Sequence, residues 1–104
     1  MEVRTRAKGR ALTIRLSGEL DHHAAHEAIT AVERALDAAM PSALTLDFGG
    51  VTFMDSSGIA VAMRAMRRMA ALGGTTALVG VPPQAKRVFD AAGIICSPKE
   101  EETT

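Results

Sequence analysis

The chain has 104 residues, and twelve Lys and Arg balance twelve Asp and Glu to give a formal net charge of zero. That length fits one domain with one core, and a hydrophobic fraction of 47% excludes a disordered chain. Zero net charge excludes a global attraction to nucleic acid or to an anionic membrane. A single cysteine, Cys96, excludes an internal disulfide framework. No apolar run approaches the roughly 20 residues of a membrane span. We therefore expect a cytoplasmic domain that contacts neither nucleic acid nor membrane directly.

Two strands open the chain. Residues 3–7 alternate weakly between apolar and polar side chains, and from Ala11 the alternation sharpens. Leu12, Ile14 and Leu16 share one face of this second strand. The short Gly-containing connection between the two strands predicts a hairpin.

A helix and a third strand follow. Apolar residues recur at helical spacing from Ala25 to Met40, Asp21 is a plausible N-cap, and Pro41 marks the end. Residues 44–48 alternate as a strand that Gly49-Gly50 is expected to break. The apolar residues 51–54 then lead to two serines.

A second helix is predicted from about Ser56 to Leu72, ended by Gly73-Gly74. Its expected core stripe consists of Ile59, Met63, Met66, Met69 and Ala70, and its arginines Arg64, Arg67 and Arg68 are interpreted as a solvated face. This methionine-rich stripe indicates core filling more than an exposed groove.

The last elements are a buried-looking strand over residues 75–81, a third helix between Pro82-Pro83 and Gly93, and a short apolar piece at residues 94–96. Strands separated by helices indicate crossover connections and a largely parallel sheet. We predict the α/β class: one domain over residues 1–97, with a mixed sheet of four to five strands, an N-terminal hairpin and about three helices. Residues 98–104 are predicted to form a flexible acidic tail.

The candidate site is Asp55-Ser56-Ser57-Gly58, between the carboxyl end of a strand and the amino end of a helix. Open α/β sheets usually place their sites at such an edge. One interpretation is structural: Asp55 or Ser56 caps the helix, and Gly58 permits tight packing. The other is a phosphorylation site, because free amides and the helix dipole favour an anion. Both hold together if Ser56 caps the helix and Ser57 is exposed.

Two enzymatic or metal-binding alternatives are weaker. A serine hydrolase of the elbow type needs Gly-x-Ser-x-Gly, and this pattern does not occur around the serines. The cluster of His22, His23 and His26 suggests metal binding, but it lacks the His-Glu-x-x-His order of zinc enzymes. We expect no catalytic residue, no cofactor and no metal site.

Three segments resemble one family. "VTFMDSSGIAV" resembles the signature of the STAS domains, the sulfate-transporter and anti-sigma-factor-antagonist family. "RLSGELDHHAAHEA" resembles the segment before the first helix in its sporulation branch, whose members antagonise the anti-sigma-F factor, and "PPQAKRVFDAAGI" resembles the third helix. Together the three segments span most of the chain, in the family's order.

The resemblance implies a STAS fold and a partner-switching phosphoprotein that catalyses nothing. The unphosphorylated form would bind an anti-sigma factor that is also an ATP-using serine kinase, and so release a sigma factor for transcription. Phosphorylation of Ser57 would switch it off, and a PP2C-like phosphatase would reset it. The implied partner-binding residues are Asp21, Asp55, Ser56, Ser57, Gly58 and Ile59. An antagonist of a stress-response sigma system is the alternative within the family.

Overall fold

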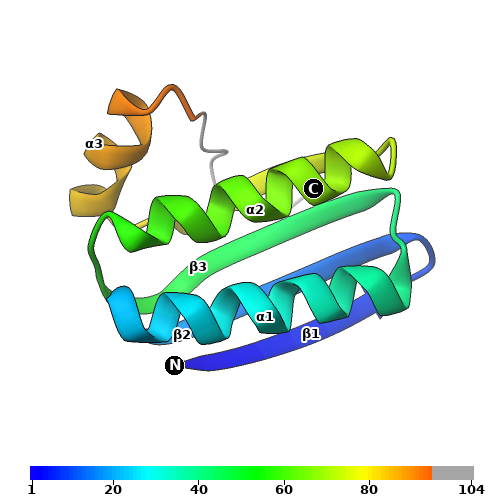
Figure 1. Ribbon diagram of the computed structural model, residues 1–104, viewed down its shortest axis with the longest axis horizontal. Helices are drawn as coiled ribbons and strands as arrows, with labels where there is room; N and C mark the ends of the chain where they lie inside the picture. Colours follow the sequence, from blue (N-terminus) through cyan, green and yellow to red (C-terminus); the bar gives the residue numbers. More distant parts are fainter. Residues whose placement is uncertain (95–104) are drawn as a thin grey trace.

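The computed structural model describes residues 1–94 (Figure 1). Its elements in chain order are β1 (Glu2–Lys8), β2 (Ala11–Leu20), α1 (His22–Ala39), β3 (Ala43–Met54), α2 (Ser57–Ala71), β4 (Thr75–Val79) and α3 (Pro83–Ala91). The four strands form one sheet in the order β1-β2-β3-β4. β1 and β2 pair antiparallel as a hairpin, whereas β2, β3 and β4 are parallel. The predicted α/β class, mixed sheet, opening hairpin and three helices are confirmed.

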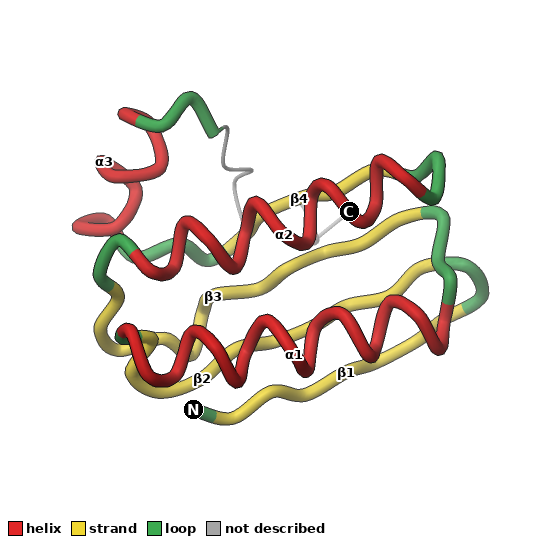
Figure 2. The backbone as a smooth tube through the Cα atoms, in the orientation of Figure 1, coloured by secondary structure: helices red, strands yellow, loops and turns green. Residues whose placement is uncertain are grey.

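The core lies between the sheet and the helices. α1 and α2 pack side by side across one face, and α3 lies beyond the amino end of α2 (Figures 1 and 2). The expected alternation places Leu12, Ile14 and Leu16 of β2 fully inside. Phe48 of β3 meets Phe89 of α3 edge to face, with ring centroids 5.6 Å apart.

The two glycines of β3 do not break the strand, and this prediction was wrong. β3 continues through Gly49 and Gly50 to Met54, while its pairing with β2 shifts register twice. Such irregularities bend a strand and increase its twist. A side chain at Gly50 would collide with that of Ser17. These glycines therefore allow a bulged strand instead of ending it.

The predicted core stripe of α2 was also wrong in part. The buried residues of α2 are Gly58, Val61, Ala62, Ala65 and Met69. Met63 and Met66 are 40% and 37% exposed, and Ala70 is exposed, because the helix is turned from the predicted face. Among the buried residues, Gly58 lets the first turn approach β2 and β3 closely, because a Cβ there would meet Met54 and Leu20.

Other boundaries differ slightly. Met40, expected on the apolar face of α1, is a left-handed C-cap and 57% exposed. β4 ends at Val79, and its residues are mostly half-buried. Ile94 is buried but lies outside any strand, whereas Ile95, Cys96 and the predicted tail at 98–104 lie outside the described residues. The predicted domain limit at residue 97 lies there too and stays a prediction.

Candidate functional site

Asp21 and Asp55 follow two strands at the same point. Leu20 of β2 and Met54 of β3 are register partners, and each precedes one aspartate. The backbone N–H of Asp55 donates to the carbonyl of Leu20 at 3.4 Å. Parallel strands therefore bring together two loops that are far apart in sequence. This carboxyl edge is where sites of such sheets usually lie.

Asp21 is the N-cap of α1, as predicted. Its backbone is extended, and its Oδ1 accepts a hydrogen bond from the N–H of Ala24 at 2.9 Å. That bond stabilises the carboxylate and lowers the pKa of Asp21 below its ordinary value of 3.8. An acid here also suits the positive end of the helix. Asp21 thus has a structural role and stays half-buried at the surface.

Residues 55–57, here called the serine loop, cap α2 through one of the two predicted side chains. Oδ1 of Asp55 accepts from the N–H of Ser57 at 2.8 Å. Ser56 makes no side-chain capping bond and is exposed, whereas Ser57 is half-buried. Of the two predicted caps, Asp55 is confirmed, because its carboxylate reaches the amide two residues along the chain. The version in which Ser56 caps the helix and Ser57 is exposed was wrong.

The first amides of α2 are already engaged. The N–H of Gly58 donates to the carbonyl of Asp55 at 3.0 Å, and that of Ile59 donates to the carbonyl of Ser56 at 3.1 Å. Together with the Ser57–Asp55 bond, these contacts satisfy three donors expected to be free. An anion at this helix end has to compete with Asp55 for the Ser57 amide.

Gly58 fixes the position of the loop against the sheet. A methyl group at Gly58 would overlap the side chain of Met54 and come within 3.3 Å of Leu20 Cδ2. The absence of a side chain therefore lets the first turn of α2 rest on the ends of β2 and β3. This agrees with the expected role in tight packing. Ile59, the next residue, is half-buried against the core.

The arginines of α2 are less free than predicted. Arg64 pairs with Glu33 and Arg68 with Asp37, both at 2.9 Å. These pairs join α2 to α1 along their length. The predicted solvated face does not include these pairs, because α1 and α2 become neighbours only in the folded domain. Arg67 is exposed.

The histidines lie at the start of α1. His22, His23 and His26 are exposed, and the rings of His22 and His23 meet edge to face at 5.9 Å. Within residues 1–94, no group of three or more His, Cys, Asp or Glu could hold a metal ion. No hydrogen bond joins a histidine side chain to either serine in that same part of the chain.

The family is decided by comparison with known proteins. The STAS domain family matches residues 2–103. The chain belongs to the STAS family. The anti-sigma F factor antagonist of Lysinibacillus sphaericus is 34% identical to this STAS domain over 83 residues, which cover 80% of this chain and 71% of that protein.

Solved structures agree with this assignment. The Bacillus cell fate determinant SpoIIAA in its phosphorylated form has a TM-score of 0.74 with this STAS domain, at 29% identity, and the match covers 98% of this chain and 96% of that one. The anti-sigma factor antagonist SpoIIAA in its unphosphorylated form has a TM-score of 0.79 at the same identity, covering 98% and 93%. No described helix of the chain is long and apolar enough to span a membrane.

Proposed function

We propose that this STAS domain is an anti-sigma factor antagonist controlled by phosphorylation of Ser57. The unmodified form binds an anti-sigma factor that is also a serine kinase, and a sigma factor is released. The kinase uses ATP to phosphorylate Ser57, the complex dissociates, and a PP2C-like phosphatase restores the free serine. The protein is cytoplasmic and catalyses nothing itself. The kinship with anti-sigma F factor antagonists supports the sporulation system over a stress-response one.

The observation that carries the proposal is the position of Ser57. It is the first residue of α2, held by Asp55 at the edge where Asp21 also lies. A partner that contacts this edge meets the proposed binding residues: Asp21, Asp55, Ser56, Ser57, Gly58 and Ile59. A phosphate on Ser57 adds roughly −1.5 to −2 charge beside the Asp55 carboxylate. Binding is then lost through like-charge repulsion and steric bulk at one surface.

The test uses the purified chain with the anti-sigma F kinase of a related bacillus. With ADP, we expect a stable complex by size-exclusion chromatography. With ATP, we expect one added phosphate by intact mass, on Ser57 by fragment spectra, and loss of the complex. Ser56→Ala is the matched control and should still be phosphorylated. Phosphate on Ser56, or none with a kinase of proven activity, would refute the proposed switch.

A further inference from the structure

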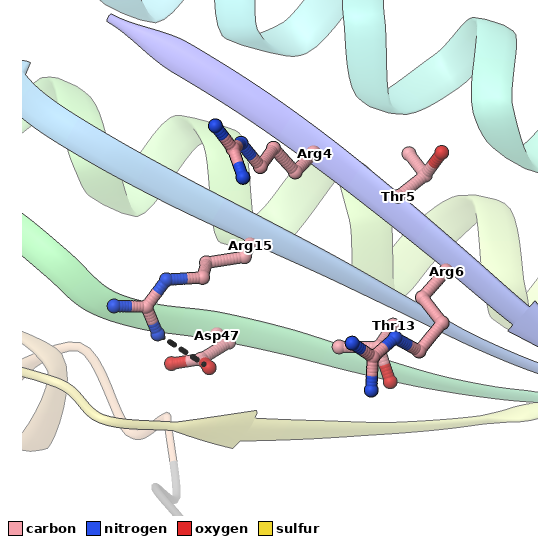
Figure 3. Close-up of a pocket in the computed structure, with 6 residues that line it drawn as sticks. All are labelled: Arg4, Thr5, Arg6, Thr13, Arg15 and Asp47. Atoms are coloured by element: carbon pink, nitrogen blue, oxygen red, sulfur yellow. Dashed lines mark hydrogen bonds and ion pairs between the residues drawn. The ribbon is translucent and has the colours of Figure 1, made fainter.

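The sheet face opposite the helices carries arginines on the two strands of the N-terminal hairpin, β1 and β2. In Figure 3 this face is turned toward the viewer, and the helices lie behind the strands. Arg4 of β1 stands directly opposite Arg15 of β2, and Arg6 stands opposite Thr13. All four are on the face away from the core, since Leu12, Ile14 and Leu16 alternate with them.

These side chains surround a hollow of about 510 Å³, lined by Arg4, Thr5, Arg6, Thr13, Arg15 and Asp47. Directly opposite residues on paired strands have Cβ atoms about 5 Å apart, and diagonal neighbours about 7–8 Å apart. The three guanidinium groups, on long stems, are therefore within reach of one ligand. The Thr13 hydroxyl adds a neutral donor at the same place.

Asp47 and Glu2 neutralise only part of the positive charge of the three arginines. Asp47 Oδ2 accepts from Arg15 at 3.0 Å, and its Oδ1 accepts from the N–H of Gly49 at 2.7 Å. Glu2 pairs with Arg4 at 3.2 Å, but those side chains are 59% and 74% exposed, so the pair is weak. Among the described residues, Arg6 has no ion pair.

Two physical arguments favour a bound ligand, over water alone, on this face of the sheet. Like charges directly opposite on paired strands are destabilising, as Arg4 and Arg15 are here. Parallel strands are also normally covered on both faces, yet no helix within residues 1–94 covers this face of β2, β3 and β4. A bound anion would offset the repulsion between Arg4 and Arg15, and the uncovered face leaves room for it.

We propose that this arginine face, formed by Arg4, Arg6 and Arg15, binds a phosphoryl-type oxyanion. Guanidinium groups present paired donors that match phosphate oxygens, and charge-assisted bonds of this kind are the stronger ones. Asp47 lines the same hollow, and its negative charge is offset by Arg15 and by the Gly49 amide, so Arg4 and Arg6 supply the excess positive charge that attracts the ligand. The proposal is independent of the serine loop and of the proposed switch.

The test titrates the full chain with inorganic pyrophosphate at constant ionic strength, followed by amide chemical shifts. We expect saturable shifts confined to residues 4–6, 13–15 and 47–49. Arg4→Gln and Arg6→Gln should each weaken binding about tenfold, the loss typical of one hydrogen bond to an ionised group. Arg34→Gln, on the exposed side of α1, is the matched control and should bind like the parent.

Other results overturn the proposal. Unchanged affinity in both variants, or shifts that do not saturate, would mean general screening and no site. Shifts centred on residues 55–59 would assign the anion to the helix end. Vesicles of phosphatidylcholine with phosphatidylglycerol distinguish the source of the phosphoryl group: binding of both probes, lost in the variants, indicates a lipid headgroup, and binding of pyrophosphate alone indicates a free ligand.

Discussion

The backbone amide of Ser57 donates to the carboxylate of Asp55 at 2.8 Å, so the proposed phosphorylation site is held by the acid two residues before it. The same bond caps α2 and orients the residue that carries the switch.

Removing the Asp55 carboxylate should weaken the start of α2. Asp55→Ala leaves the Ser57 amide without its partner, and loss of a helix cap typically costs about 1 kcal/mol of unfolding free energy. Asp55→Asn keeps an acceptor oxygen and should cost less. Urea unfolding of the three proteins measures the difference. Equal stability of Asp55→Ala and the parent would show that this bond contributes nothing.

A negative charge at Ser57 should affect binding far more than folding. Ser57→Asp places a second carboxylate beside Asp55 at a half-buried position whose side chain makes no hydrogen bond within residues 1–94, so we expect a stability change of about 1 kcal/mol or less. We expect Ser57→Asp to lose affinity for the anti-sigma factor and Ser57→Ala to keep it. Calorimetric titration and thermal melts decide this. Unfolding of Ser57→Ala would indicate a structural serine and count against the switch.

Gly58→Ala should destabilise the domain through packing. The added methyl group meets Met54 and Leu20, and overpacking of a core contact typically costs about 1–3 kcal/mol. Met54 is flexible and absorbs part of the clash. Ala60→Ser, on the exposed side of the same helix, is the control and should melt near the parent. A Gly58→Ala protein as stable as the control would show that the first turn of α2 has room to move.

Stability should fall in acid partly because of Asp21. Its pKa is lowered in the folded chain, chiefly by the hydrogen bond from the Ala24 amide, so the unfolded chain binds more protons. The stabilisation is therefore present above the ordinary pKa of 3.8 and is lost as the pH falls through the lower, folded value. Asp21→Asn keeps a cap without titrating, and its unfolding free energy should depend less on pH below about 4. Identical pH profiles of the two proteins would contradict this role.

The order of elements and the place of the serine motif between a strand and a helix could be predicted from local sequence. Alternation in residues 12–16 requires one face of β2 to be buried, Asp21 has the chemistry of an N-cap, and Pro83 with Gly93 bracket the third helix. The serine motif lies where a strand pattern changes to a helix pattern. Each of these features depends on residues that are close together in the sequence, so the local sequence is enough to predict them.

Tertiary structure decided which residues face the core and what the motif contacts. β3 continues through its glycines because Ser17 on a neighbouring strand fits against Gly50. α2 buries Ala62 and Ala65 and exposes Met63 because packing against the sheet and α1 sets the rotation of the helix. Arg64 and Arg68 find acids on α1, and Arg4 meets Arg15, only because strand pairing brings distant segments together. Periodicity along one segment carries no information about these neighbours, because they come from other parts of the chain.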